Sequence, residues 1–158
     1  MKVFISHQRH DSVLAAAVAA RLRTVHAIDC YVDVIDPYYG GPVETLADHI
    51  REEMAKCTQL LAIVSASTSS SQWVPWEIGV ATEKSFPLAT FSGANHIPPE
   101  FLRKWPYLRS DSDLDEYARI SKRTARSLVE KRAQFDAGYA RRSTTSEFFT
   151  ELKASLRQ

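Results

Sequence analysis

Apolar residues gather in short runs along the chain, and longer stretches with apolar residues at helical spacing lie between them. The run LLAIVS at 60–65 has no polar alternation, which is typical of a strand buried on both faces of a parallel sheet. We therefore expect it at the centre of the sheet. Shorter runs rich in β-branched and aromatic residues predict four further strands, at 3–6, 30–34, 86–91 and 105–109.

The stretches between these runs have the period of amphipathic helices. After the first strand, apolar residues from Val13 or Leu14 to Leu22 share one stripe, and Asp11 or Ser12 is expected to cap this helix. A second helix repeats apolar side chains at helical spacing, at Leu46, Ile50, Met54 and Cys57. A third helix contains Glu77.

Two helical segments are expected at the C-terminal end. The first runs from about Leu114 to Phe135 and stops near Gly138. The second begins after residues 143–145 with a T-x-x-E capping pattern that ends at Glu147. One face of this second helix carries Phe148, Leu152 and Leu156.

Alternating strands and helices joined by short links predict an α/β fold, with an open five-stranded parallel sheet, helices on both faces and right-handed crossovers. The chain of 158 residues is long enough for one well-buried core and short for two. We expect a single domain over residues 1–158, with the helices from about 112 to 157 packed on it.

Composition and charge narrow the function. A formal net charge of +1 argues against nucleic acid as a partner, and we interpret the basic segment 119–142 as a solvated helix face rather than a polyanion site. The sequence has no apolar run long enough to span a membrane and no signal-peptide pattern, so a cytoplasmic protein without a membrane partner is expected. Cys30 and Cys57 are interpreted as small buried hydrophobic residues rather than a bridge.

A site is expected where the segments that follow the first three strands converge. These segments, SHQRHD, DVIDPYYGGP and SASTSSSQWVPWE, meet at the carboxyl edge of a parallel sheet. They contain no glycine-rich phosphate-binding motif and no G-x-S-x-G nucleophile motif. His7 and His10 have no third His or Cys nearby, so no metal and no cofactor is expected.

Glu77 lies among tryptophans at the start of the third helix. Pro75 is tolerated in a first helical turn and predicts a helix start around residues 72–74, so Glu77 follows that turn closely. Trp73 is four residues away and shares its face. One interpretation is that Glu77 complements the helix dipole while both tryptophans fill the core. The other is that Glu77 belongs to a cleft that binds a ligand.

A lone carboxylate beside an aromatic wall suits one glycosidic reaction in particular. Most glycosidases need two carboxylates, because one must protonate the leaving oxygen. The nicotinamide ring of NAD+ is already a cationic pyridinium and leaves as a neutral molecule. A single anionic group that stabilises the positive charge on the ribose is then sufficient.

The same residues carry a family resemblance. FISHQRHD near the N-terminus, an amphipathic helix, YVDV, LLAIVS and SSSQWVPWEI together resemble the Toll/interleukin-1 receptor (TIR) domain, in particular its NAD+-cleaving members, over roughly residues 2–92. The resemblance implies a flavodoxin-like sheet and a catalytic glutamate that matches Glu77. It also implies a substrate pocket lined by Phe4, Ser6, His7, Arg9, Asp33 and Trp73.

The sequence departs from the family pattern in two places. The loop DPYYGGP lacks the pattern of receptor and adaptor members, and His7 stands where a tyrosine is frequent. A short chain of this kind is similar to the stand-alone TIR proteins of bacterial anti-phage defence, of the Thoeris type. That similarity implies homotypic TIR assembly and a separate effector protein that responds to the product.

Three functions are compatible with these residues. The leading hypothesis is an enzyme that cleaves the nicotinamide N-glycosidic bond of NAD+ and releases ADP-ribose or a cyclic or modified ADP-ribose. The second is a non-catalytic TIR module that assembles with other TIR domains. The third is an enzyme similar to nucleoside deoxyribosyltransferases, which use a glutamate as nucleophile in a related fold.

Overall fold

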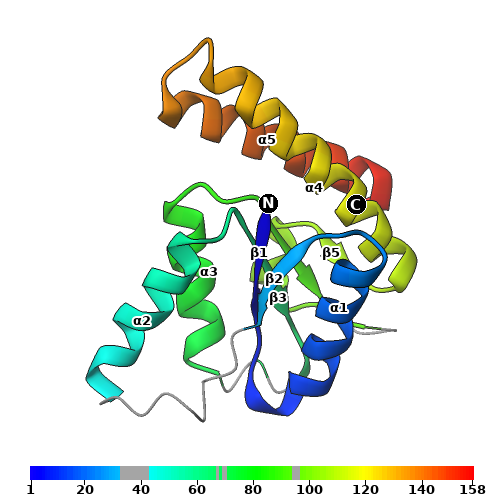
Figure 1. The fold of residues 1–158 in the computed structure, drawn as a ribbon. Helices are drawn as coiled ribbons and strands as arrows, with labels where there is room; N and C mark the ends of the chain where they lie inside the picture. The colour runs from blue at the N-terminus through cyan, green and yellow to red at the C-terminus, as the bar shows by residue number, and fades with distance from the viewer. Residues whose placement is uncertain (33–42, 67, 69–70, 94–96) are drawn as a thin grey trace.

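The structure is a computed structural model that describes residues 1–32, 43–66, 68, 71–93 and 97–158 (Figure 1). The strands are β1 (Lys2–Ser6), β2 (Asp29–Val32), β3 (Gln59–Ile63), β4 (Leu88–Phe91) and β5 (Tyr107–Leu108). The α-helices are α1 (Ser12–Thr24), α2 (Val43–Ala55), α3 (Trp73–Glu83), α4 (Asp111–Arg132) and α5 (Ala137–Leu156). The 3-10 helices η1 (Arg9–Asp11) and η3 (Glu100–Lys104) lie in the connections.

The five strands form one parallel sheet in the order β2-β1-β3-β4-β5. β3 is the middle strand, and all five of its residues are buried. The predictions of an open parallel sheet and of its central strand are therefore confirmed. Strand order reverses between β1 and β3, and in open α/β sheets ligands bind at such a point, outside the carboxyl ends of the strands.

Helices cover both faces of the sheet (Figure 1). On one face, α2 and α3 pack on side chains such as Phe4, Leu60 and Leu88. On the other face, α1, the first half of α4 and the second half of α5 pack on the alternate residues of the same strands, which include Val3 and Leu61. The four apolar positions predicted to align on the second helix are all buried in the first of these two clusters. Leu46, Ile50 and Met54 lie on α2, whereas Cys57 lies just beyond its end at Ala55.

The two C-terminal helices form a hairpin whose boundaries differ from those predicted. Helix α4 begins at Asp111, because Ser110 at its N-cap accepts a hydrogen bond from the amide of Asp113 at 3.1 Å. It ends at Arg132, three residues before the predicted end at Phe135. The start was predicted late because the first apolar residue of the helix, Leu114, lies inside its first turn.

Helix α5 begins at Ala137, so the predicted start after residues 143–145 is wrong. Asp136 is the N-cap, and its carboxylate accepts a hydrogen bond from the amide of Tyr139 at 2.9 Å. The hydroxyl of Thr144, the first residue of the T-x-x-E pattern, instead donates to the carbonyl of Ala140 at 2.6 Å within the helix. Gly138 lies in the first turn of α5 and does not separate the two helices.

The hairpin lies across the amino ends of the strands, near the N-terminus of the chain (Figure 1). The hydroxyl of Tyr117 donates to the side-chain oxygen of Gln59, the first residue of β3, at 3.0 Å. Tyr117 also contacts Phe148 edge-on, with ring centroids 6.0 Å apart. Both side chains are fully buried, so the hairpin contributes to the main core.

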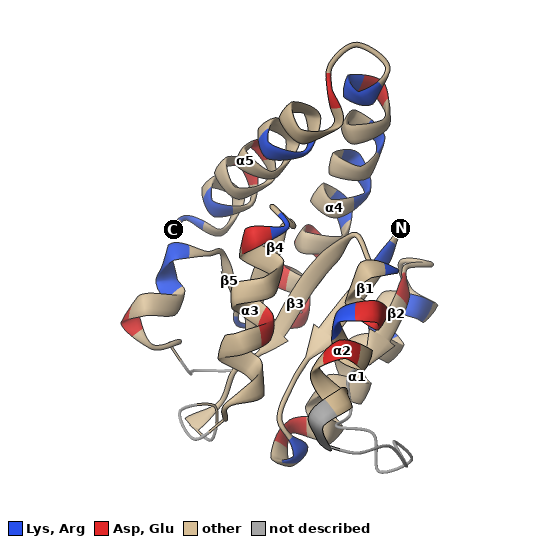
Figure 2. Ribbon diagram, turned by 90° about the vertical axis from the view of Figure 1, so that its left-hand side faces the viewer, with Lys and Arg blue, Asp and Glu red and all other residues tan. Residues whose placement is uncertain are grey.

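The basic residues of 119–142 lie along α4 and α5 (Figure 2). Several of them form ion pairs within the hairpin. Arg123 pairs with Glu151, and Lys131 pairs with Glu147. Across the described residues, no helix is both long enough and apolar enough to cross a membrane.

Candidate functional site

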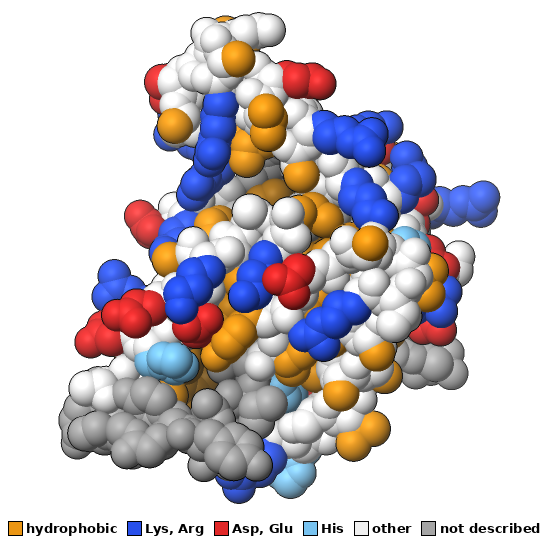
Figure 3. All heavy atoms as spheres, viewed as in Figure 1, with side chains coloured by type: hydrophobic (Ala, Val, Ile, Leu, Met, Phe, Trp, Pro, Cys, Tyr) orange, Lys and Arg blue, Asp and Glu red, His pale blue; other side chains and the backbone are white. Residues whose placement is uncertain are grey.

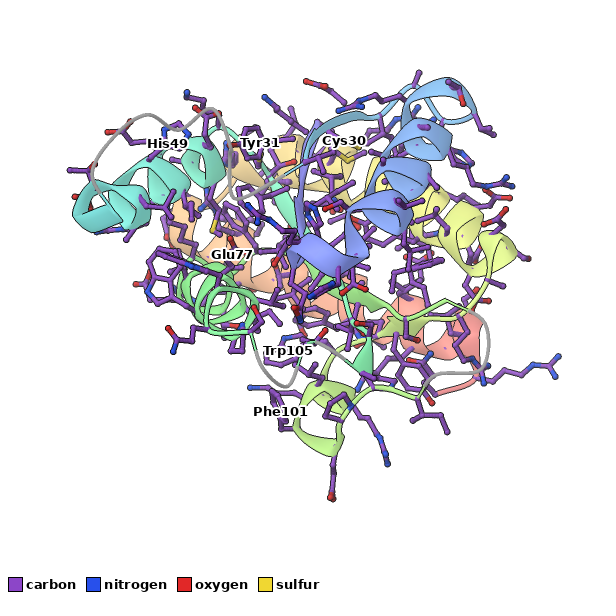
Figure 4. All side chains as sticks on the ribbon, turned by 90° about the horizontal axis from the view of Figure 1, so that it is seen from below. Cys30, Tyr31, His49, Glu77, Phe101 and Trp105 are labelled. Atoms are coloured by element: carbon purple, nitrogen blue, oxygen red, sulfur yellow. The ribbon has the colours of Figure 1, made fainter. Side chains whose placement is uncertain are left out.

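The candidate site lies at the carboxyl edge of the sheet, which Figure 4 views directly. Glu77 lies there between α3 and the strands (Figure 4). Tyr31 of β2 and His49 of α2 lie on the side of Glu77 that faces away from α3. Ser6 is the last residue of β1, in register with Ala62 of β3. The site therefore forms on the face of the sheet that α2 and α3 cover.

Ser6 and Glu77 are in direct contact. The hydroxyl of Ser6 donates a hydrogen bond to Oε2 of Glu77, and both side chains are fully buried. A buried carboxylate is costly unless hydrogen bonds compensate for its lost hydration, and a bond to a charged acceptor is stronger than a neutral one. The chain thus holds one carboxylate in a defined position at the edge where ligands bind in this class of fold.

Helix α3 sets the direction of Glu77. The helix begins at Trp73, as predicted from Pro75, and the hydroxyl of Ser71 accepts a hydrogen bond from the amide of Val74 at 3.2 Å. Glu77 is therefore on the second turn and faces the strands, since Val74, Ile78 and Ala81 on the same side are buried. The helical spacing of these residues is sufficient to explain why Glu77 is buried.

The two tryptophans of α3 contact each other. Their rings meet edge-on, with centroids 5.6 Å apart, and both are partly buried against the core beneath α2 and α3. Trp73 shares the helix face of Glu77, as its spacing predicts. Packing thus accounts for part of each indole.

Phe4 lies in the core beneath the candidate site rather than on its surface. It is fully buried, and its ring is 5.3 Å from the ring of Tyr31 in the neighbouring strand β2. It points to the same face of the sheet as Ser6, two residues further along β1. Phe4 therefore packs in the core beneath Ser6.

His7 and Arg9, which were also assigned to the pocket, follow the end of β1. His7 is buried, and its Nε2 is 3.3 Å from the hydroxyl of Ser12 at the start of α1. Arg9 is exposed in η1, and its carbonyl accepts a hydrogen bond from Ser12 at 2.7 Å. Asp33 and the loop DPYYGGP lie outside the described residues.

The structure adds a second polar cluster at the same edge. Asp11 occupies the N-cap position of α1, as predicted, but its side chain makes no capping bond. Its Oδ2 instead accepts a hydrogen bond from the hydroxyl of Ser65 at 2.9 Å, and the amide of Ser65 donates to Thr68 Oγ1 at 2.8 Å. Asp11 therefore joins the segment after β1 to the segment after β3. An acidic residue in a loop after a strand was the only sequence signal for this role.

The site offers carboxylate and hydroxyl oxygens. Within the described part of the chain, no three residues among His, Cys, Asp and Glu gather closely enough to hold a metal ion. The two cysteines lie elsewhere in the core, free and buried, and burial raises the pKa of each thiol to about 11. They are therefore unreactive core residues, which confirms the interpretation of both as small hydrophobic side chains.

Comparisons with known proteins identify the fold and the family. A family model described as the TIR domain matches residues 3–124 of the chain. No curated protein sequence matches significantly. Among solved structures, a 2-deoxyribosyltransferase from the psychrotolerant bacterium Bacillus psychrosaccharolyticus superposes with a TM-score of 0.57 and 13% sequence identity. The superposition covers 72% of this chain and 90% of that chain, and at this identity it shows the shared fold alone.

Proposed function

The chain belongs to the TIR-domain family, and from this premise we propose that it cleaves the bond between nicotinamide and ribose in NAD+. Glu77 is the catalytic residue of this proposal, and NAD+ is a substrate rather than a bound cofactor. The observation that carries it is the buried Glu77 carboxylate, which accepts the Ser6 hydroxyl at the carboxyl edge of the sheet.

The chemistry follows from the charge of the leaving group. Nicotinamide departs with the electrons of the C–N bond and becomes neutral, so positive charge develops on the ribose. A carboxylate held nearby in a site of low dielectric stabilises that charge without reorganisation. Ser6 acts as a positioning residue, because its hydroxyl fixes the Glu77 carboxylate before substrate arrives.

The product depends on which nucleophile reaches the ribose first. Attack by water gives ADP-ribose, and attack by a group of the same molecule gives a cyclic ADP-ribose. In the proposed setting, such a product is a signal in bacterial anti-phage defence that a separate effector protein reads in the cytoplasm. Ser6, His7, Arg9, Asp33 and Trp73 are proposed to line the substrate pocket, and Phe4 is proposed to support it from beneath Ser6.

Full burial of Glu77 adds a condition to this proposal. The ribose must reach the carboxylate, so the contacts between α3 and the carboxyl edge must open when substrate binds. Homotypic TIR assembly is the proposed cause of this opening. The rate of nicotinamide release per protein molecule should then rise with protein concentration.

The test is nicotinamide release from NAD+ by the purified chain, followed by chromatography and mass spectrometry over a range of protein concentrations. Glu77→Gln keeps the shape of the side chain and an acceptor for Ser6 but removes the charge. We expect it to lower the rate by about 100-fold or more. Glu83→Gln is the matched control, because Glu83 is exposed at the end of the same helix and should leave the rate unchanged.

Two results would overturn the assignment. One is a folded Glu77→Gln variant with unchanged activity. The other is wild-type protein that is inert toward NAD+ at every concentration while it still assembles, which is the behaviour of a non-catalytic TIR module.

Nucleoside 2-deoxyribosyl transfer is a second candidate. The solved structure of a 2-deoxyribosyltransferase shares this fold, and an enzyme of that type would use Glu77 as a nucleophile on a deoxyribose. Incubation with deoxyadenosine and a free acceptor base separates the two candidates. Base exchange without nicotinamide release from NAD+ would favour the transferase.

A further inference from the structure

A cavity lies at the opposite end of the sheet from Glu77. It has a volume of about 240 Å³ and lies between the hairpin and the segments that lead into β3 and β4. Figure 3 shows apolar side chains in the hollow beneath the hairpin. This cavity shares no residue with the candidate active site, so its occupant is independent of the proposed NAD+ chemistry.

The body of the cavity is apolar. Phe86 and Pro87 form its wall on the side of β4, and Ala125, Leu128 and Val129 of α4 form the wall on the side of the hairpin. Apolar walls of this kind favour a ligand with an apolar body, because such a ligand leaves water on binding.

The buried polar groups of the wall already have partners. The side-chain oxygen of Gln59 accepts from Tyr117, and its nitrogen donates to the carbonyl of Ser121 at 3.5 Å. The thiol of Cys57 donates to the carbonyl of Glu53 at 3.5 Å. The hydroxyl of Thr145 donates to the carbonyl of Ser85 at 2.7 Å. These groups therefore add little hydrogen-bonding capacity for a ligand.

Two arginines supply positive charge to the cavity. Arg132 is the last residue of α4, and Arg141 lies on α5 with its guanidinium 5.8 Å from the centroid of the Phe86 ring. Arg141 donates to the carbonyl of Lys84 at 3.4 Å, which partly fixes its position. Neither arginine forms an ion pair with a described residue, whereas Arg119, Arg123 and Lys131 of the same hairpin all do.

The lining also contains no carboxylate. A cavity with an apolar body, two available guanidinium groups and no acidic residue is complementary to an anion with an apolar tail. A carboxylate pairs with a guanidinium through two oxygens, and it is small enough to leave most of the volume to the tail. By comparison, a cavity of about 150 Å³ holds benzene, so this one holds about ten non-hydrogen atoms.

We propose that this cavity is a binding site for a small carboxylate with an apolar body, whose carboxylate pairs with Arg132 and Arg141. The apolar body occupies the space between Phe86 and Leu128. Bound in this way, the ligand links both helices of the hairpin to the segment before β4.

The experiment titrates the full chain with 3-phenylpropanoate by isothermal calorimetry and by ligand-observed NMR. We expect saturable binding at one site per chain. The neutral 3-phenylpropanamide, which has the same shape, should bind at least tenfold more weakly. Acetate, which lacks the apolar body, should not bind measurably.

Two kinds of variant test the contribution of the arginine charges and the contribution of the cavity volume separately. Arg141→Gln and Arg132→Gln should each weaken binding about tenfold or more. Ala125→Leu keeps both arginines but fills part of the cavity, and it should abolish binding. Arg142→Gln is the matched control, because Arg142 is an exposed neighbour of Arg141 that does not line this cavity. Circular dichroism establishes that each variant is folded.

The proposal is overturned if the folded protein does not bind 3-phenylpropanoate saturably at millimolar concentration. It is equally overturned if the amide binds as tightly as the carboxylate, or if Ala125→Leu leaves the affinity unchanged. Because no arm of the experiment contains NAD+, these results are independent of the test of Glu77.

Discussion

At the scale of single residues, the hydrogen bond between Ser6 and Glu77 is the central contact of the candidate site. Both side chains are fully buried, and the serine is the hydrogen-bond donor. The bond has a structural as well as a chemical role, because it offsets part of the cost of burying the carboxylate. A change in Ser6 should therefore affect stability and activity together.

We predict that Ser6→Ala lowers the free energy of unfolding by about 1.5–3 kcal/mol, the usual loss for a hydrogen bond to a charged group. It should also lower the rate of nicotinamide release, because the carboxylate loses its fixed position. Urea unfolding and the NAD+ assay measure the two effects. Ser65→Ala is the control, since it removes a comparable bond to the Asp11 carboxylate at the same edge. Equal activity in Ser6→Ala and wild type would contradict the positioning role.

At the scale of elements, capping residues decide where the C-terminal helices begin. The side chain of Asp136 accepts a hydrogen bond from the amide of Tyr139, and α5 starts six residues before Ser143. The T-x-x-E pattern misleads because it is a local signal, and an earlier aspartate offers the same chemistry. The helix continues through residues 143–147 because Phe148 and Thr144 are buried on the face that meets the core.

Asp136→Ala should therefore destabilise the protein by about 1 kcal/mol. Asp136→Asn, which keeps an acceptor at the N-cap, should retain most of the stability. Amide hydrogen exchange should show faster exchange in the first turn of α5 for Asp136→Ala only. An unchanged melting temperature in Asp136→Ala would mean that α5 begins later in the sequence.

A charged contact connects α1 to α4. Arg21 donates two hydrogen bonds to Asp115, at 2.8 and 2.7 Å, and His26 Nε2 is 2.7 Å from Asp115 Oδ1. The hydrogen bonds from Arg21, and then the bond with His26, hold the pKa of Asp115 well below its usual range. A carboxylate with a lowered pKa in the folded state stabilises the protein above its unfolded pKa, and the contribution is lost as the pH falls toward the folded pKa.

The expected result is that the free energy of unfolding of wild type falls below about pH 4 more steeply than that of Asp115→Asn. At pH 7 the variant should be less stable than wild type, and the difference should shrink as the solution becomes acidic. Urea titrations at several pH values measure this. Asp48→Asn is the control, because the ion pair of Asp48 with Arg51 is exposed. Parallel pH profiles for wild type and Asp115→Asn would contradict the prediction.

At the scale of the whole molecule, the hairpin completes the core on the face of the sheet opposite to Glu77. Phe148 and Leu152 of α5 are fully buried in the same cluster as strand residues such as Val3 and Leu61. The family model ends at residue 124, so α5 lies outside the matched region and still shares the core. The fold of this chain therefore depends on a helix beyond that region.

Phe148→Ala should cost about 3–5 kcal/mol, the range observed for removal of a large buried aromatic side chain. Tyr139→Ala is a control on the same helix, and it should cost much less because Tyr139 is 48% exposed. Urea unfolding with a fluorescence signal measures both. A small effect of Phe148→Ala would mean that the hairpin is only loosely attached to the sheet.

The two ends of the sheet thus carry different features. The carboxyl edge holds Ser6 and Glu77, and the amino edge holds the cavity that Arg132 and Arg141 help to line. They are separated by the length of the central strands, so a ligand at one edge does not touch the other. Substitutions at each edge therefore test one proposal at a time.

The sequence by itself determined the features that depend on neighbouring residues. Uninterrupted apolar runs indicated buried strands and the central position of β3, and Pro75 indicated the start of α3 and the helix face of Glu77. Only the tertiary structure decided which distant groups meet. Ser6 and Glu77 are 71 positions apart, Asp11 bonds to Ser65 instead of capping its own helix, and Arg132 and Arg141 come together on two helices. Periodicity records which way a side chain faces, but its partner is chosen by the packing of whole elements.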